Sequence, residues 1–564
     1  MYGGAFYGFF TIFQDRLFPT AELPRGEKEK IDVFLNLLEE SGVGEIIYEE
    51  TFKDKSMGGR SSYNPYRLFA SIIYAFSKHS GSLRKIEESL KFDLRFLYLN
   101  NQETPSYVTI SKFLNNIFVK HFESIFAKIT SAIINKYQIS IDNCFIDGTK
   151  IEANANKYNF VYKPIKFKLN LFEKIRNLLA QHFQLSENKK TFVSKEVAVY
   201  LSEMLEMLKS HNIDIDNIQI GRGHRNSKIV TDYFLLSSYL IKLLDYEEKE
   251  EICGPNRNSY YKTDHDATAM CLKEDYYSGL GSNTHAAYNL QIIVSKGIIL
   301  SFYVSQDRTD QYTLIPALNK FYELYKFYPK RICADAGYGS LKNYQYVIDK
   351  NIDNYIKFGD WSKVVSGEKY DLYHFNENGE LICLNGKTAL KTRVYENRHA
   401  HKGTFLYVIE SCSYCRFKKY CQSGLKEIRK YRIFDVNYDY FEIRKQVTEN
   451  LLSPKGIEMR VNRSSQVEGA FGVIKQDMDY DRARRRGLES VSLEFMLTCL
   501  GYNIRKLFLL IDGKAKMDYW KVPNDLKAET IPTIGYEKIF KKRKKGKNES
   551  LRDTYKHKKR AARN

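Results

Sequence analysis

Apolar residues recur at three- and four-residue spacing along the first quarter of the chain, which is the period of an amphipathic helix. The pattern is clearest within residues 27–136, in the runs Leu68, Ile72, Ile73, Phe76 and Leu83, Ile86, Leu90. Short turns separate these segments. The pattern therefore predicts an all-helical N-terminal domain over residues 1–140.

A possible DNA-reading element lies near the end of this helical region. The pair Thr104-Pro105 is typical of an N-cap followed by a first helical position. The helix that it would start places Ser106, Thr109 and Lys112 on one outer face, as in the second helix of a helix-turn-helix. The alternative is a plain helical bundle with no contact to DNA.

The middle of the chain alternates between strand and helix patterns. An apolar run at residues 144–147 predicts a strand that carries Asp147, and residues 165–250 return to helical spacing. Two apolar segments, residues 287–294 and 298–304, flank the turn Ser295-Lys296-Gly297 and predict a β-hairpin.

The remaining elements follow in alternation. Thr309-Asp310 is expected to cap a helix that reaches about Tyr328, and a short strand then ends at Asp335. Another helix from about Ser340, a fifth strand at residues 354–358 and a closing helix at residues 455–476 complete the pattern. Glu468 lies inside the closing helix.

The order of these elements resembles the RNase H-like fold. It begins with three antiparallel strands, continues with helix, strand, helix and strand, and ends with the closing helix. The predicted class is therefore α/β, with a mixed five-stranded sheet. The expected catalytic core comprises residues 141–164, 251–362 and 440–512. A helical insertion at residues 165–250, a cysteine-containing insertion at 363–439 and a basic tail at 513–564 complete the expected organisation.

Three acids stand at points where this order would bring them together. Asp147 lies in the first strand, Asp335 ends the adjacent fourth strand, and Glu468 lies on the closing helix. Carboxylates that converge from separate elements are what two-metal phosphoryl transfer requires. Because the ligands are hard oxygens, Mg²⁺ or Mn²⁺ is expected, as two ions.

Two further acidic segments have a structural interpretation. Glu152 is expected to face solvent from its strand, and Thr263 to Ala267 is expected to form a turn. Asp266 in that turn is a weaker candidate for an additional carboxylate near the metals.

Four motifs in this order resemble the DDE transposases of bacterial insertion sequences, in particular the group numbered eleven-eighty-two. They are the helical block from Tyr63 to Glu87, the first-Asp stretch Ile146 to Ala155, Ala334 to Ser340, and Val467 to Lys475. The resemblance implies a transposase that cuts and rejoins DNA ends, binds the ends and the target as double-stranded DNA, and assembles as a homodimer on DNA.

The family's signature around the last acid is only partly kept. Lys475 lies seven residues after Glu468, on the same helical face, and is expected to hold DNA near the cut. The signature's tyrosine and arginine positions hold other residues, with Arg460 and Arg463 nearby. At α-helical spacing Arg460 lies closer to the face of Glu468 than Arg463 does, which favours Arg460 for a phosphate contact.

The charge of the chain supports a polyanionic partner. Lysine and arginine total 88 against 68 acidic residues, a formal charge of +20, although a Lys-rich proteome could produce the same excess. One basic run, Arg484-Arg485-Arg486, directly follows the closing helix, and others lie in the tail at residues 541–545 and 556–560. These runs are expected to contact phosphates.

The nine cysteines fall into two groups. Five stand alone in apolar surroundings, as buried thiols of a reducing compartment do. The other four, Cys383, Cys412, Cys415 and Cys421, have a spacing that suggests a small structural zinc site, with free thiols or disulfides as alternatives. Trp361, just before this insertion, could stack on a base, but core packing is the favoured interpretation.

The N-terminal residues 1–13 are aromatic but lack the features of a signal peptide, and Asp15 follows too early for a membrane span. A cytoplasmic, nucleoid-associated protein is expected. Two other functions stay open: another RNase H-like nuclease, and a domesticated DNA-binding protein descended from a transposon. The three acids argue against the second.

Overall fold

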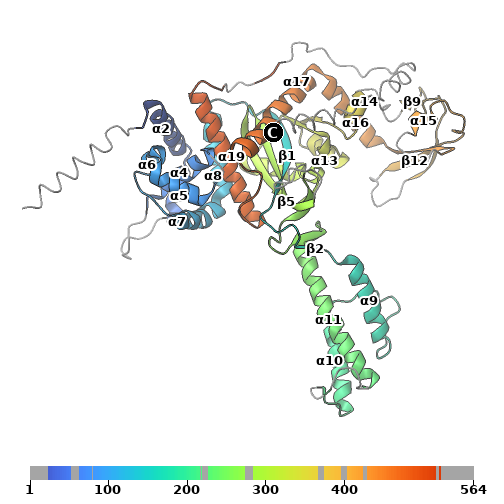
Figure 1. The fold of residues 1–564 in the computed structure, drawn as a ribbon. Helices are drawn as coiled ribbons and strands as arrows, with labels where there is room; N and C mark the ends of the chain where they lie inside the picture. Colours follow the sequence, from blue (N-terminus) through green and yellow to red (C-terminus); the bar gives the residue numbers. More distant parts are fainter. Residues whose placement is uncertain are drawn as a thin grey trace, which may run out of the picture.

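A computed structural model describes residues 23–51, 63–78, 81–215, 218, 226–272, 284–365, 374–394, 403–422, 429–515 and 520–522. The N-terminal residues 1–22 and nearly all of the predicted basic tail, including residues 541–545 and 556–560, lie outside these ranges. Figure 1 shows a central body with one insertion extending below it and another extending to the side.

The N-terminal region is helical, as predicted. Its helices are α2 (Arg25–Glu40), α3 (Val43–Thr51), α4 (Pro65–Lys78), α5 (Leu83–Phe92), α6 (Leu94–Leu99), α7 (Tyr107–Phe113), the π-helix η2 (Leu114–Phe118) and α8 (Val119–Lys136). The segments α7, η2 and α8 follow one another without a break. The predicted recognition helix is thus the beginning of a longer helix, and its N-cap is Ser106 instead of Thr104 because the Ser106 side chain accepts the N–H of Thr109.

The central sheet contains β1 (Asn143–Glu152), β4 (Thr268–Cys271), β5 (Thr284–Ser295), β6 (Ile298–Ser305), β7 (Arg331–Ala334) and β8 (Asp353–Ile356). β5 runs antiparallel to β1 and β6, while β7 runs parallel to β1 and β8. These are the five predicted strands. The sixth, β4, pairs with the first residues of β5, beyond the stretch of β5 that pairs with β6.

Helices connect and cover the sheet, two of them where the sequence predicts a helix and two, at residues 361–365 and 438–452, where it does not. They are α12 (Leu314–Tyr325), α13 (Leu341–Asp349), α14 (Trp361–Val365) and α16 (Tyr438–Leu452), with the short 3₁₀ turns η4 (Asp310–Tyr312) and η5 (Ala336–Tyr338). The predicted closing helix is found over residues 454–477 as α17 (Pro454–Arg463), η6 (Ser464–Glu468), α18 (Gly469–Gly472) and η7 (Val473–Asp477). Because η6 and η7 are π-helical, its winding differs from the uniform α-helix assumed from the sequence.

The last described helix, α19 (Leu488–Ile511), joins the N-terminal helices to the sheet. It packs against α4 and α8 of the N-terminal region and against β6 of the sheet. The contact with α4 is very close, since a Cβ added at Gly501 would lie 2.4 Å from the carbonyl oxygen of Phe76. One continuous hydrophobic core therefore extends from α2 through α19 to the sheet.

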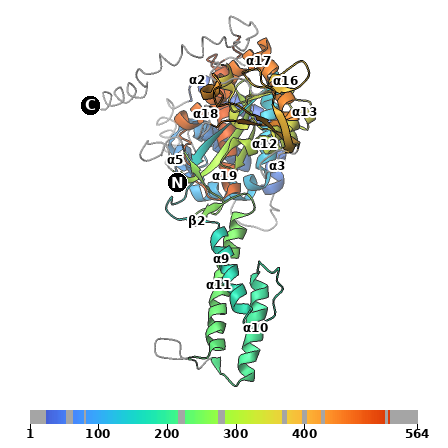
Figure 2. The same ribbon diagram turned by 90° about the vertical axis from the view of Figure 1, so that its right-hand side faces the viewer.

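The two insertions each have a separate small core. α9 (Ile165–Leu179), α10 (Ser194–Ser210) and α11 (Lys228–Cys253) form an arm that projects from the body beside β2 (Phe160–Tyr162) and its partner β3 (Ser259–Tyr261), as Figures 1 and 2 show. The second insertion contains β9 (His374–Phe375), β10 (Leu381–Ile382), β11 (Leu390–Val394), β12 (Thr404–Ile409), α15 (Lys418–Cys421) and β13 (Arg432–Asn437).

Across the described ranges, every helix is too short or too polar to cross a membrane.

Candidate active site

Asp147 and Asp335 lie side by side because of strand register. β1 and β7 are parallel, and Phe145 is the pairing partner of Cys333. Each aspartate follows its paired residue by two positions, so both side chains emerge on the same face at neighbouring points of the sheet. The sequence prediction that these two acids meet is consistent with this arrangement.

The two aspartates have different surroundings. The Asp147 side chain is 21% exposed and accepts the N–H of Gly148 at 2.9 Å. Burial raises its pKa, an effect that the charge of Arg463 opposes. The Asp335 side chain is 51% exposed, and its Oδ1 lies 3.6 Å from Nζ of Lys357, just after β8.

Glu468 is joined to both aspartates through Arg463. One guanidinium nitrogen of Arg463 lies 3.1 Å from Oδ2 of Asp147; the other lies 2.9 Å from Oε1 of Glu468 and 3.9 Å from Oδ2 of Asp335. The Arg463 side chain is only 7% exposed. Burial by itself would lower the pKa of Arg463, but the nearby carboxylates, Asp147 foremost, raise it above its ordinary value. The three predicted acids therefore surround one buried cation.

The expectation that Arg460 would be closer than Arg463 to Glu468 is wrong, and the reason is the π-helix η6. Residues five apart lie nearly above one another in a π-helix, whereas the prediction assumed α-helical winding from Arg463 to Glu468. Arg460 instead lies over the ring of Trp361, 5.7 Å from its centroid. Trp361 is 4% exposed, which confirms the preference for core packing.

The π-helix also bears on the signature that the sequence kept only in part. Ser464 stands at the family's arginine position, and its Oγ donates to Oε2 of Glu468 at 3.0 Å. A π-helical turn accommodates one extra residue in a helix. With that extra residue, Arg463 takes the place beside Glu468 that an arginine four residues earlier would have in a regular α-helix.

The carboxylates fit a hard divalent cation in chemistry, since oxygen ligands from three elements are what Mg²⁺ and Mn²⁺ prefer. As the side chains stand, no three potential ligands in the described ranges are arranged to hold a metal ion. At this site the guanidinium of Arg463 lies among the carboxylates. A cation bound by all three acids would have to displace or share the bonds that Arg463 makes.

Asp310 is a fourth acid beside the site, with a role that was not predicted from the sequence. The expectation that Thr309-Asp310 caps a helix is wrong, because neither side chain makes a capping hydrogen bond at η4 or α12. The Asp310 carboxylate instead accepts Nδ2 of Asn289 at 2.8 Å and Nε2 of Gln291 at 3.1 Å. The signal available in the sequence was the presence of two amides, alternating on a strand that is otherwise apolar.

Lys475 and the basic run flank the same end of the sheet. Nζ of Lys475 donates to the carbonyl oxygen of Lys150 on β1 at 3.4 Å. The backbone N–H groups of Arg484 and Arg485 are held by Glu494 of α19, which is 4% exposed. The Arg485 side chain donates to Asn115 of η2 at 3.0 Å, so it links the basic run to the N-terminal helices.

The remaining acidic predictions have clear outcomes. Glu152 is 4% exposed, so the expectation that it faces solvent is wrong: its carboxylate points toward Arg482 and His285, each 3.9 Å away. The turn at Thr263 to Ala267 is structural, as expected. Asp264 accepts the Tyr288 hydroxyl, and Asp266 accepts the N–H of Leu488 at the start of α19.

The two residues predicted to read DNA both lie on α7. Lys112 is exposed, whereas Thr109 is half-buried and its hydroxyl lies 3.2 Å from that of Ser106. The exposed side chains of Tyr107 and Val108 lie on the same turn.

The four predicted zinc ligands line one small cavity in the second insertion. Cys383 follows β10, Cys412 and Cys415 follow β12, and Cys421 ends α15. The N–H of Asn385 donates to Sγ of Cys383 at 3.4 Å. Burial raises the pKa of the Cys412 and Cys421 thiols, and the other cysteines of the group raise both further. All four are free thiols here, which contradicts the disulfide alternative.

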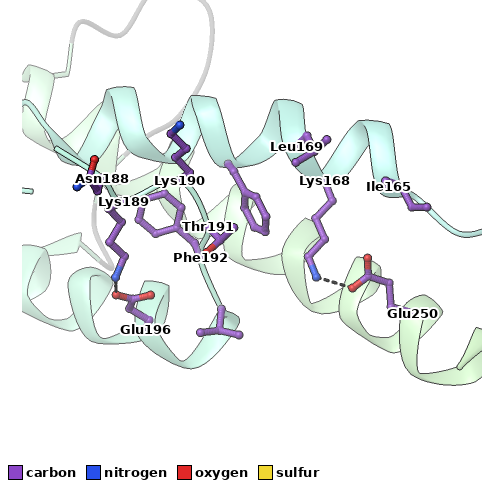
Figure 3. Close-up of a pocket in the computed structure, with 12 residues that line it drawn as sticks. Ile165, Lys168, Leu169, Asn188, Lys189, Lys190, Thr191, Phe192, Glu196 and Glu250 are labelled. Carbon is purple, nitrogen blue, oxygen red and sulfur yellow. Dashed lines mark hydrogen bonds and ion pairs between the residues drawn. The ribbon is translucent and has the colours of Figure 1, made fainter. Parts of the chain in front are cut away.

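A hollow between the helices of the arm lies apart from the acids (Figure 3). Two of its lysines are paired with carboxylates: Lys168 with Glu250 at 2.5 Å, and Lys189 with Glu196. The pairing neutralises these two lysines, and Lys190 is the third lysine of the lining.

Comparison with known families gives two matches. The Transposase DDE domain matches residues 382–508, which include Glu468, and the Transposase domain (DUF772) matches residues 27–116. No curated protein and no solved structure matches the chain. The protein is thus an enzyme of the DDE transposase class, in which divalent metal ions support phosphoryl transfer on DNA.

Proposed function

We propose that this transposase binds the ends of an insertion sequence and catalyses both strand cleavage and strand transfer, with Asp147, Asp335 and Glu468 as its catalytic acids. The observation that carries the proposal is the meeting of these acids from β1, the end of β7 and the closing helix around Arg463. The strand order also supports an RNase H-like core.

In this proposal the three carboxylates hold two Mg²⁺ or Mn²⁺ ions, which would activate the attacking oxygen and stabilise the leaving oxygen. The chain's own part is to fix the geometry. Strand register sets the two aspartates side by side, and the π-helix sets Glu468 opposite them. Arg463, once released from the acids, lies within reach of a phosphate.

The DNA contacts are proposed on both sides of this site. Lys475, Arg460, Arg484, Arg485 and Arg486 would contact backbone phosphates, and Thr109 and Lys112 on α7 would contact bases. A homodimer would hold the two ends together, as the resemblance implies. The four cysteines would bind one structural zinc ion that stabilises the second insertion.

Cleavage of DNA that carries the element's own ends tests the catalytic assignment. Asp147→Asn, Asp335→Asn and Glu468→Gln remove one charge each with little change of shape, and each should abolish nicking in Mg²⁺ or Mn²⁺ while end binding persists. Asp477→Asn is the control, because Asp477 lies on the same closing helix but pairs with Arg505. Full nicking by any of the three variants would remove that residue from the site.

A further inference from the structure

Asp310 and the residues around it form a polar network directly behind the catalytic aspartates. Asn289 and Gln291 are fully buried on β5, and both donate to Oδ1 of Asp310. Nε2 of Gln291 also donates to Oδ1 of Asn289 at 3.0 Å. The buried hydroxyl of Tyr338 donates to Oε1 of Gln291, which directs the Gln291 amino group toward Asp310. Each member thus orients the next.

The network touches the backbone that follows each catalytic aspartate. Gly148 follows Asp147 and pairs with Gln291 across the sheet. A Cβ at Gly148 would lie 2.1 Å from Nε2 of Gln291 and 2.9 Å from Oδ1 of Asp310. Only a glycine therefore lets these two side chains pass over β1 at this point.

The second contact is with the turn after Asp335. A Cβ at Gly337 would lie 3.4 Å from Oδ2 of Asp310. Tyr338, in the same turn η5, completes the network through Gln291. Asn343 also donates to the carbonyl oxygens of Gln311 and Tyr338, which holds η4 and η5 together.

The Asp310 carboxylate makes no ion pair within the described part of the chain. Its hydrogen bonds there come from amide donors, and its oxygens lie against Gly148 and Gly337, which follow the two catalytic aspartates in the chain. A partly buried carboxylate with no cationic partner loses favourable hydration, and hydrogen bonds from fixed donors such as these amides offset that loss. The bonds made by Asp310 connect η4 to β5. β5 in turn pairs with β1, which carries Asp147, and its Gln291 accepts the hydroxyl of Tyr338 from the turn after Asp335.

We propose that Asp310 is a positioning residue of the active site, whose hydrogen bonds to β5 fix the separation of Asp147 and Asp335. This inference rests on the proposed function, because it assumes that those two aspartates bind the ions. Asp310 acts through the backbone after each aspartate and is not itself an ion ligand.

Direct Mn²⁺ binding, followed by the electron paramagnetic resonance signal of free Mn²⁺, tests the proposal without any cleavage step. Asp310→Ala should weaken Mn²⁺ binding about 10- to 100-fold, as the loss of outer-shell partners does at metal sites. Asp310→Asn should stay within about threefold of wild type, because an asparagine oxygen can accept the same two amide donors. Asp307→Ala is the control, since Asp307 lies in the same loop and its side chain, within the described ranges, hydrogen-bonds with Ser305 and not with the network.

Two results would overturn the proposal. Equal losses in Asp310→Asn and Asp310→Ala would mean that the charge acts directly, as a ligand does. Unchanged Mn²⁺ affinity in a folded Asp310→Ala protein would mean that the network does not position Asp147 and Asp335. If Asp310→Ala does not fold, Gln291→Met removes one donor and leaves the acid, and it should still weaken binding. Failure of the proposed function is distinguished by Asp147→Asn, which would then bind Mn²⁺ as wild type does.

Discussion

Replacing Arg463 with glutamine should destabilise the protein without metal and make it more responsive to metal. The guanidinium contacts two of the proposed catalytic carboxylates, those of Asp147 and Glu468, within 3.1 Å and is almost fully buried. Its loss leaves three acids facing one another, with Lys357 at 3.6 Å from Asp335 as a remaining counter-charge. A divalent cation would then bind the carboxylates without having to displace the guanidinium of Arg463.

The size of the effect follows from the exposure of each bond. The bond to Asp147 is mostly buried, and a hydrogen bond between charged groups contributes about 1.5–3 kcal/mol. The bond to Glu468 is half exposed on the acid side, which limits it to about 1 kcal/mol. Together they predict a destabilisation of about 2–4 kcal/mol. At about 2–4 °C per kcal/mol for a large domain, Tm should fall by about 4–16 °C.

Thermal unfolding with and without Mn²⁺ measures both parts of the prediction. A ligand at about one hundred times its Kd stabilises by about 2.7 kcal/mol, but in wild type part of this gain is offset by the Arg463 bonds that the ion must replace. Mn²⁺ should therefore raise the Tm of Arg463→Gln more than that of wild type. The matched control is Arg505→Gln, which removes an exposed arginine–carboxylate pair outside the site.

Equal rises of the two Tm values in Mn²⁺ would refute this prediction, because Arg463 would then not compete for the carboxylates. So would an Arg463→Gln protein that, in the absence of metal, is no less stable than Arg505→Gln.

Two other parts of the proposal have direct tests. Elemental analysis should find about one zinc per chain, and Cys412→Ser should abolish zinc binding and lower the Tm of the second insertion; a metal-free wild type that is equally stable would refute the site. Changing Lys112 to alanine should reduce the preference for element ends over random duplex by about 1–3 kcal/mol in competition binding. Neutralising Arg484 and Arg486 should instead weaken binding to every sequence and lower the salt slope by about 0.9 for each phosphate that is no longer neutralised; a change in sequence preference would contradict that assignment.

The acids could be predicted because their positions follow from strand order alone. An apolar run that ends in Asp335, and another that contains Asp147, need only parallel pairing to bring the two side chains together. That pairing follows once the order of strands and helices is known, since side chains alternate with a fixed period along a strand. The placement of Glu468 on the closing helix follows from the same order.

Arg463 could not be placed because the helix that carries it is not uniformly wound. Single-sequence periodicity assumes about 3.6 residues per turn, and a π-helical turn shifts every earlier residue around the axis relative to Glu468. The local sequence Ser464-Ser465-Gln466-Val467 does not predict the change from α-helical to π-helical winding. The winding is set by tertiary contacts, including the bond from the N–H of Gly297, in the turn after β5, to the side-chain oxygen of Gln466.

The role of Asp310 differs from the predicted helix cap for a related reason. A Thr-Asp pair before an apolar helix is a good local signal for a cap, but local preference yields when a side chain has stronger partners elsewhere. Two buried amides on β5 needed an acceptor, and Asp310 is that acceptor. Asn289 and Gln291, which interrupt an apolar run, therefore indicated that an acceptor lies nearby. Only the pairing of β5 with β1 shows on which side of the sheet that acceptor must lie.

The N-terminal helices and the catalytic sheet share α19, although the sequence predicts a domain boundary at residue 140. Phe508 of α19 packs against Phe34 and Tyr74 of the N-terminal helices, and Lys30 pairs with Asp512 at 2.8 Å. A fragment that ends near residue 136 would expose these aromatic surfaces to water, so it does not isolate the proposed DNA-reading element. The same α19 packs on β6 of the catalytic sheet. Because a single helix is shared by both regions, DNA bound on α7 would be held at a fixed distance from the acids, and binding studies need the full chain.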